Sequence, residues 1–231
     1  MPALAFPPPG TLPVPLASDL CLAATVAADL NAPADATVSR CVSAASRAIA
    51  RLCGRTFERA NVTEYPDSYG RPFLLLARPP IVAVVSVSEG AELLDAGSYT
   101  SAGDLAEGGL LYRLEGSWPD TGNAGGLVTL TTDFRQGRAD ALAVTYTGGF
   151  VTPGQVALDP SLGPVTLPPD VEEAAILEAC ALYRGRGRDA DVASEGLGDW
   201  SVSYRERAPG QQLASVRAEL MLASYVLRRA S

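Results

Sequence analysis

The sequence predicts an α+β fold, in which a helical bundle of about four helices carries an inserted antiparallel β-sheet or small β-barrel. Two observations predict it: apolar residues recur with helical spacing towards both ends of the 231-residue chain, and short β-branched runs separated by turns fill its middle. The composition, 47% hydrophobic and 19% charged, is typical of a globular protein with a sizeable core. We expect five regions: a Pro-rich N-terminal arm (1–16), N-terminal helices (17–60), a β-rich insertion (61–152), a linker (153–169) and C-terminal helices (170–231).

The N-terminal part predicts an arm followed by two helices. Prolines at positions 2, 7, 8, 9, 13 and 15 exclude a helix or a central strand, so the arm is expected to be extended or disordered. Ser18 and Asp19 predict the N-cap and acidic first turn of a helix that Asn31-Ala32-Pro33 ends. A second helix is expected from Asp35 to Cys53, with Gly54 at its C-cap. Its apolar stripe consists of Val38, Val42, Ala45, Ile49 and Leu52.

The middle of the chain predicts short strands. Turn signals at Arg78-Pro79-Pro80, Glu89-Gly90, Asp120–Gly126 and Gln136-Gly137 separate them. In the last strand, Leu142, Val144 and Tyr146 alternate with smaller or polar residues, which indicates a sheet with one packed face. The expected strands are Phe73–Ala77, Ile81–Ser88, Leu110–Leu114, Leu127–Thr132 and Ala141–Thr147.

The C-terminal part predicts two more helices after a Pro- and Gly-rich linker. Asp170 and Glu173 match a capping box that opens the first of them, and this helix ends in a basic run, 184–188. The second is expected from about Gln211 to Arg229. Its heptad-like apolar seam consists of Leu213, Val216, Leu220, Ala223 and Leu227.

The charged residues exclude several kinds of chemistry. Histidine and lysine are absent, so the 18 basic residues are all arginine, and with 26 acidic residues the net charge is −8. The missing histidine excludes Ser-His-Asp and Cys-His catalysis and the usual mixed zinc sites, and the missing lysine excludes a Ser-Lys pair. The acidic excess argues against a general nucleic-acid binder, which needs basic residues to displace counterions.

The cysteines and the N-terminal residues indicate the cellular compartment in which the protein is expected to be made. Cys21, Cys41, Cys53 and Cys180 form no CxxC pair and no metal-ligand spacing, so they are predicted to be small buried hydrophobic residues in a reducing compartment. The N-terminus lacks the basic and uninterrupted apolar regions of a secretory signal, and no apolar run approaches the ~20 residues of a membrane span. Intracellular synthesis is therefore expected.

Three local patterns are candidates for binding or catalysis. Arg184, Arg186 and Arg188 alternate with glycines and could contact a phosphate or DNA, or they could be a solvated helix C-terminus. Glu172-Glu173 could belong to a glycosidase pair, although first-turn helix acids are the commoner explanation. The glycine pairs match neither a P-loop nor a dinucleotide fingerprint. No motif requires an enzyme, a metal or a cofactor.

The order of segments resembles the head–tail connector (adaptor, or neck) proteins of long-tailed bacteriophages. The similar segments cover most of positions 17 to 229. They depart from the family's pattern in a longer proline arm and an additional hairpin over Leu127–Thr147. The resemblance rests on Ala48–Phe57 with its Gly-Arg-x-Phe turn, Arg78–Val87, Val144–Phe150, Leu167–Asp170 leading to Ala181–Arg184, and Ser194–Tyr204.

The resemblance implies a non-enzymatic structural protein of the virion, synthesised in the bacterial host cytoplasm and located at the capsid–tail junction. Its implied partners are the portal protein, other copies of itself in a ring (usually twelve), a downstream neck or tail protein, and genomic DNA that passes through the channel without sequence-specific binding. No cofactor is implied. Another neck or tail structural protein is an alternative function, and a carbohydrate-binding or carboxylate-dependent glycan-active module on the β region is another.

Two surfaces are predicted to mediate assembly. The C-terminal seam (Val216, Leu220, Ala223 and Leu227) is expected to pack on a partner helix, either within the same subunit's bundle or in the portal. Trp200 and Tyr204, predicted to lie in a Gly-containing loop, are expected at a subunit or ring interface, because buried aromatic residues are effective interface anchors.

Overall fold

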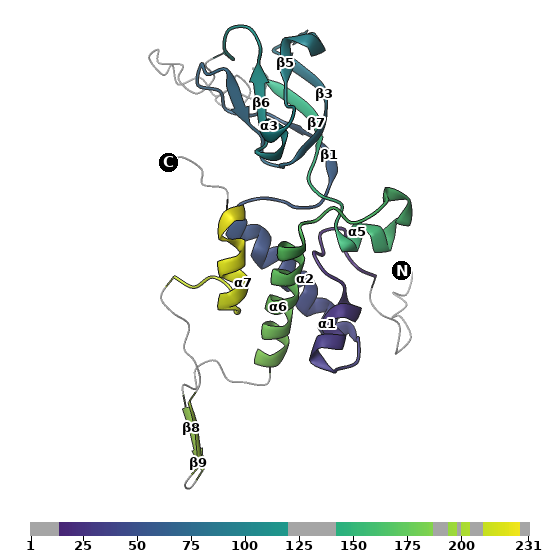
Figure 1. Ribbon diagram of the computed structural model, residues 1–231, viewed down its shortest axis with the longest axis vertical. Helices are drawn as coiled ribbons and strands as arrows, with labels where there is room; N and C mark the ends of the chain where they lie inside the picture. Colours follow the sequence, from purple (N-terminus) through teal and green to yellow (C-terminus); the bar gives the residue numbers. More distant parts are fainter. Residues whose placement is uncertain (1–13, 120–141, 187–193, 198–199, 204–209, 227–231) are drawn as a thin grey trace, which may run out of the picture. The chain divides into compact units, whose positions relative to one another are not determined.

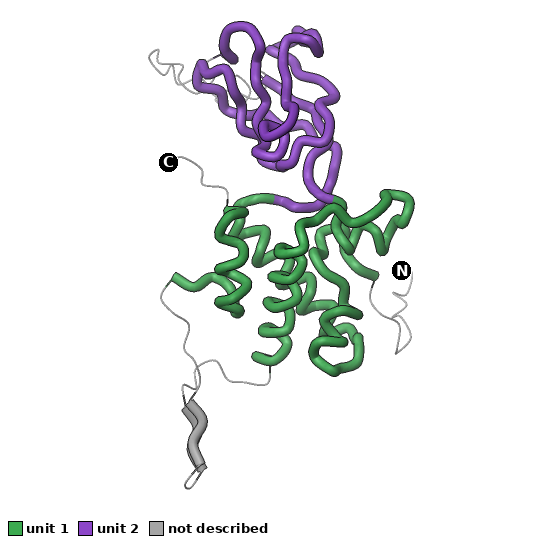
Figure 2. The backbone as a smooth tube through the Cα atoms, viewed as in Figure 1, with its two compact units in different colours: residues 1–55, 151–231 green, residues 56–150 purple. Residues whose placement is uncertain are grey.

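The computed structural model confirms the α+β class and divides the chain into two compact units (Figures 1 and 2). One unit comprises residues 1–55 and 151–231 and is mainly helical, and the other comprises residues 56–150 and is mainly β. The structure describes residues 14–119, 142–186, 194–197, 200–203 and 210–226. The predicted strand Leu127–Thr132 and the hairpin that would contain it lie largely outside these residues.

Helices α1 (Ala23–Leu30) and α2 (Ala36–Cys53) begin the helical unit. Gly54 ends α2 with a φ of 65°, as predicted. The helix begins one residue later than expected, because Asp35 is its N-cap and its side chain accepts hydrogen bonds from the Thr37 and Val38 amides. Asn31, with a φ of 49°, ends α1. The predicted α2 stripe is buried except for Leu52, which is half-buried. The start predicted for α1 at Ser18 is wrong.

Tertiary hydrogen bonds explain the later start of α1. The Leu20 amide donates to Ser46 Oγ at 2.9 Å, and the Asp19 carboxylate accepts from the Leu16 amide at 2.8 Å. The Asp19 carbonyl also accepts from the Gly154 amide. Because these groups have partners elsewhere, residues 16–20 form a turn that is held against α2 instead of a helical turn.

The C-terminal half of the helical unit is built on α6 (Pro169–Gly185), which packs against α2, α1 and α7 (Val216–Met221). The predicted capping box at Asp170 is wrong, because Pro169 is already the first helical residue, and the N-cap residue, Pro168, makes no side-chain capping hydrogen bond. The expected linker contains a short helix, α5 (Pro153–Leu158), and a 3-10 turn, η2 (Pro160–Leu162). Thr152 and Gln155 form a complete capping box on α5.

The β unit contains two antiparallel sheets that pack around one apolar core. The four-stranded sheet has the order β1-β7-β3-β4, and the three-stranded sheet has the order β2-β6-β5. Both sheets contribute to the core: Leu74 and Leu111 come from the smaller one, and Val87, Val144 and Tyr146 from the larger one. Two sheets facing one core are closer to a small sandwich than to the barrel alternative. The elements are β1 (Ala60–Glu64), β2 (Phe73–Leu75), β3 (Ile81–Glu89), β4 (Glu92–Leu93), η1 (Ala96–Ser98), β5 (Tyr99–Thr100), α3 (Asp104–Glu107), β6 (Leu110–Arg113) and β7 (Ala143–Gly148).

Four of the five expected strands are confirmed within a few residues at each end, as β2, β3, β6 and β7. Leu142, Val144 and Tyr146 are buried and alternate with partly exposed residues, as predicted. Sequence reasoning missed β1, β4 and β5, which are short or polar. Strand β1 pairs with β7 throughout its length, from Ala60 opposite Gly148 to Glu64 opposite Val144.

Candidate interaction surfaces

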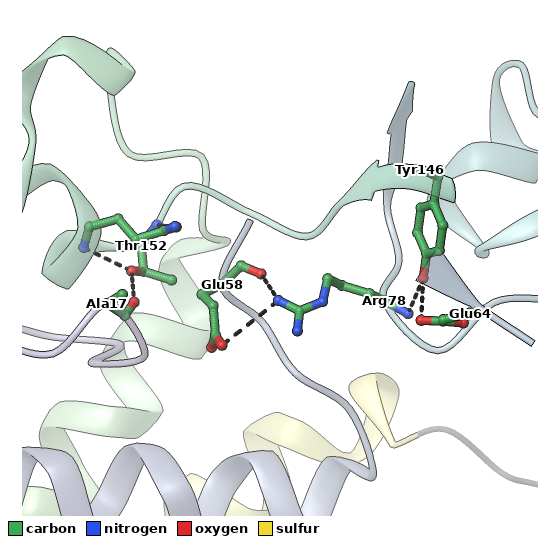
Figure 3. A network of polar contacts seen from close by, with 7 residues as sticks. Ala17, Glu58, Glu64, Arg78, Tyr146 and Thr152 are labelled. Carbon is green, nitrogen blue, oxygen red and sulfur yellow. Dashed lines mark hydrogen bonds and ion pairs between the residues drawn. The ribbon is translucent and has the colours of Figure 1, made fainter. Parts of the chain in front are cut away.

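Two of the segments that carry the resemblance, Arg78–Val87 and Val144–Phe150, meet in the β unit through polar contacts of Arg78 and Tyr146 (Figure 3). The Tyr146 hydroxyl donates to Glu64 Oε1 at 2.6 Å and accepts from the Arg78 amide at 3.1 Å. The Arg78 guanidinium donates to the Glu58 carbonyl at 2.6 Å. Burial, followed by the hydrogen bond to Glu64, raises the pKa of Tyr146, so its hydroxyl remains a donor to Glu64 even at alkaline pH.

Glycine is required where β7 ends beside these groups. A Cβ added at Gly148 would lie 2.3 Å from the Arg78 carbonyl oxygen, and one added at Gly149 would lie 2.5 Å from the Glu58 carbonyl oxygen. The Phe150 amide then donates to the Phe57 carbonyl at 2.7 Å. The motif residues therefore act as fold determinants of this unit rather than as a binding site.

The C-terminal helix is shorter than predicted, and carboxylates are the reason. Glu219 accepts hydrogen bonds from the amides of Gln212 and Leu213, and Glu178 accepts from those of Ala214 and Ser215. Residues 212–215 therefore satisfy their amides through side chains and stay outside the helix. Helix α7 begins at Val216, capped by Ser215 Oγ, and a 3-10 turn, η3 (Leu222–Tyr225), follows it. The prediction of one helix from Gln211 to Arg229 is wrong.

The heptad seam does not form one buried face. Leu213, Ala218 and Leu222 are the buried residues here, at 1%, 0% and 0% exposure. Of the four residues predicted to meet a partner helix, Val216 is half-buried, Leu220 is 72% exposed, Ala223 is exposed, and Leu227 lies outside the described residues. The exposed residues Leu220 and Ala223 leave an apolar surface on α7 and η3 that the subunit's own bundle does not cover.

One hydrogen bond fixes the end of this segment to α6. The Tyr225 hydroxyl donates to the Asp170 carboxylate, at 2.8 and 2.9 Å from its two oxygens. Burial and the hydrogen bond to Asp170 raise the pKa of Tyr225 to about 12. Sequence reasoning missed this pair, and it also missed Glu178, a carboxylate that is only 2% exposed. Neither the contact of Tyr225 with Asp170 nor that of Glu178 with the Ala214 and Ser215 amides has a local sequence signal, because the partners are tens of residues apart.

The arginine run behaves mainly as a helix terminus. Arg184 and Arg186 are exposed at the end of α6, and Arg188 lies outside the described residues. Arg186 Nε donates to the Tyr183 carbonyl at 3.3 Å, and its guanidinium lies 3.9 Å from the centre of the Tyr183 ring. A cation at the C-terminal end of a helix is favourable, so the structure brings Arg186 to its own helix end.

A two-stranded hairpin follows the arginine run. Strands β8 (Ser194–Leu197) and β9 (Trp200–Ser203) pair antiparallel, with Leu197 opposite Trp200. The predicted interface residue Trp200 therefore begins a strand of a hairpin rather than lying in a loop. Tyr204, the other predicted interface residue, lies outside the described residues.

The outer face of the small sheet is an apolar surface that sequence reasoning missed. Phe73 lies directly opposite Tyr112 in the β2–β6 register, and both are more than a third exposed. Leu75, on the same face of β2, is 48% exposed. Phe73, Leu74 and Leu75 are all apolar, so the sequence has no alternation that would show which face of β2 is buried.

Within the described residues, no group of His, Cys, Asp and Glu has the arrangement of a metal site. None of the helices in the described part of the chain is long and apolar enough to span a membrane. All four cysteines are buried and free of disulfide bonds, as predicted, and burial raises the pKa of each thiol, in Cys53 to about 11.

No protein-family model and no curated protein sequence matches this chain. Among solved structures, the chain is similar to one in "Neck of empty GTA particle computed with C6 symmetry", with a TM-score of 0.53 and 15% identity over 96% of this chain and 95% of that chain. The two chains share a fold. A chain of "Neck of native GTA particle computed with C12 symmetry" aligns with a TM-score of 0.49 and 17% identity over 79% of this chain and 85% of that chain.

Proposed function

We propose that this chain is a structural neck protein of a phage-like particle, an adaptor that forms a ring on the portal and joins the capsid to the tail. The observation that carries the proposal is the fold shared with a neck chain over 96% of this chain. The resemblance of the sequence segments to head–tail connectors supports the same function independently. The proposed role is mechanical and requires no catalytic residue, which agrees with the absence of histidine and lysine from the sequence.

The proposed assembly is a ring of copies, with twelve as the expected number, through which the genome leaves. The chain that shares this fold comes from a neck computed with C6 symmetry, which supports a ring for this chain as well. The net charge of −8 supports a channel wall that repels phosphates and lets DNA slide. A channel surface with net positive charge in the assembled ring would contradict the sliding role. Arg184, Arg186 and Arg188 are the candidate DNA contacts.

The portal-binding surface is proposed to be the exposed face of α7 and the residues after it, with Val216, Leu220, Ala223 and Leu227. Leu220 supports this assignment because it is 72% exposed while Ala218 and Leu222 are fully buried. Burying a leucine side chain in an interface contributes roughly 1.5–3 kcal/mol. We expect Leu220→Glu to weaken portal binding at least tenfold with the fold intact, as measured by co-purification with the portal.

A matched control tests whether the loss of portal binding is specific to α7 or follows from changing any exposed leucine. Leu158→Glu changes a leucine that is 47% exposed on α5, in the same unit. It is expected to leave portal binding unchanged. Equal portal binding by wild type and the L220E variant would remove α7 from the proposed interface.

The hairpin β8–β9 is proposed to lie at a subunit or ring interface, with Trp200 and Tyr204 as anchors. An isolated two-stranded hairpin is at best marginally stable in water, so a neighbour that packs on it would stabilise it. Normal ring assembly by a Trp200→Ala variant, measured by native mass spectrometry, would contradict this assignment.

The function as a whole is tested in particles. Deletion of the gene is expected to give separate capsids and tails in negative-stain micrographs, and the wild-type gene supplied in trans is expected to restore joined particles. A density map of the restored particle is expected to show the chain between portal and tail. A position elsewhere in the neck or tail would favour the alternative structural role, and joined particles without this chain would refute both.

A further inference from the structure

A groove in the helical unit has no role in the functions proposed above. It has a volume of about 560 Å³ and lies between residues 14–24 and the N-terminal part of α2. Its lining is mostly apolar, with two arginines at the α2 side. The lining residues include Val14, Pro15, Leu16, Leu22, Ala23, Ala36, Ser39, Ser43, Arg40 and Arg47.

Short side chains on α2 keep this groove open. Ala36, Ser39 and Ser43 are spaced by three and four residues, so they lie on one face of the helix. On the opposite wall, Val14 is 73% exposed and Leu16 is 49% exposed, so the described residues leave two apolar side chains at the groove largely uncovered. The surface has the small and apolar character that suits an extended, uncharged segment.

A buried carboxylate oxygen at the groove is a second observation that points to an occupant. Asp19 lines the groove and is only 4% exposed. Its Oδ2 accepts from the Leu16 amide, whereas its Oδ1 is buried and accepts no hydrogen bond from the described residues. A buried acceptor without a donor is unfavourable by about 1–3 kcal/mol, which a backbone N–H from a bound segment would relieve.

We propose that the groove binds the N-terminal arm, residues 1–13, of a neighbouring copy of this chain. This inference rests on the proposed ring assembly. The arm has no charged side chain, and Leu4, Phe6 and Leu12 can supply apolar contacts. Its prolines reduce the conformational entropy that is lost on binding and remove N–H groups that would need partners.

The arm is long enough to reach a neighbouring copy of the chain. Thirteen residues in an extended Pro-rich conformation span about 40 Å at about 3.1 Å per residue. A compact unit of roughly 120 residues is about 35 Å across, so the arm is long enough to reach an adjacent subunit.

This exchange has a consequence for assembly. Each copy would donate one arm and receive another, which is a head-to-tail contact between two different surfaces. Contacts of this type generate closed rings when the rotation between subunits closes. The arm would therefore link consecutive subunits of the ring and set the direction in which they follow one another.

Site-directed cross-linking of full-length copies tests the proposal. One population carries Ala5→Cys in the arm and the other carries Ser43→Cys in the groove; the mixture is treated with a short bis-maleimide over a concentration series. The native thiols are buried with raised pKa values, so their background reaction is slow. The matched control is Ala44→Cys, an exposed position on α2 that does not line the groove. We expect roughly tenfold more covalent dimer with S43C than with A44C, and Ser39→Cys is expected to behave like S43C.

A double variant, with A5C and S43C in one chain, distinguishes binding of the copy's own arm from binding of a neighbouring copy's arm. A ladder of covalent oligomers on a denaturing gel supports exchange between copies. An intrachain product alone, or no cross-link above the A44C level at any concentration, overturns the proposal. Because these readouts use purified protein and the neck location is read from particles, either idea can fail while the other stands.

Discussion

Glu178 offers the sharpest test of how the C-terminal segment is held. This carboxylate is 2% exposed, and it accepts hydrogen bonds from the Ala214 and Ser215 amides at 2.9 and 2.8 Å. Glu178→Gln keeps the shape but replaces one acceptor oxygen with an NH2 group that faces an N–H donor. One charge-assisted hydrogen bond, worth about 1.5–3 kcal/mol, is lost, and the other becomes a weaker neutral hydrogen bond. We therefore expect the free energy of unfolding to decrease by about 2–3 kcal/mol.

The measurement is thermal and urea unfolding followed by far-UV circular dichroism, which reports mainly the helices. A loss of this size corresponds to a decrease in Tm of roughly 5–10 °C for a chain of this length. Glu173→Gln changes an exposed glutamate on the same helix and is expected to shift stability by less than about 0.5 kcal/mol. Equal Tm values for the E178Q and E173Q variants would refute the reasoning that these carboxylate contacts hold the segment before α7.

Three further predictions concern other parts of the chain. Gly148→Ala places a methyl group against the Arg78 carbonyl and is expected to destabilise the β unit by about 3 kcal/mol, read from the fluorescence of its buried tryptophan in urea, whereas Gly185→Ala, which meets open space, is expected to be neutral or slightly stabilising. Tyr225→Phe removes the hydrogen bond to Asp170 and should lower the free energy of unfolding by about 1 kcal/mol at pH 8. Because the folded-state pKa of Tyr225 is raised to about 12 from about 10, its contribution is complete below pH 10 and is lost as the pH rises to 12, so urea midpoints of wild type and the Y225F variant should converge over that range. The four thiols should react with DTNB at pH 8 only after unfolding, and fast labelling of the native protein would contradict their burial.

Patterns of local origin were predicted well from the sequence. The extent of α2, its apolar stripe and its Gly54 terminus were predicted correctly, because capping and helical periodicity depend on residues within a few turns of one another. The alternating residues of β7 were predicted for the same reason. The capping box of α5, Thr152 with Gln155, was readable from the sequence and was overlooked.

Long-range partners decided what the sequence patterns could not. The final helix was predicted too long because the amides of residues 212–215 donate hydrogen bonds to the carboxylates of Glu178 and Glu219 instead of to helical carbonyls. Glu178 lies on another helix, so the heptad pattern could not reveal this contact. The start of α1 was misplaced because Ser46, on α2, accepts a hydrogen bond from the Leu20 amide. A carboxylate or hydroxyl from a distant segment can replace helical hydrogen bonds, and no local sequence pattern predicts such a replacement.

By itself, the sequence determined the α+β class, the insertion of a β-rich segment between helical parts, and the exclusion of histidine- and lysine-dependent chemistry. Only the tertiary structure decided which apolar residues remain uncovered: the exposed Leu220 on α7, and the groove beside α2 that is bordered by Val14 and Leu16. The physical reason is that periodicity gives the face on which a side chain lies, whereas its burial depends on whether another element packs there.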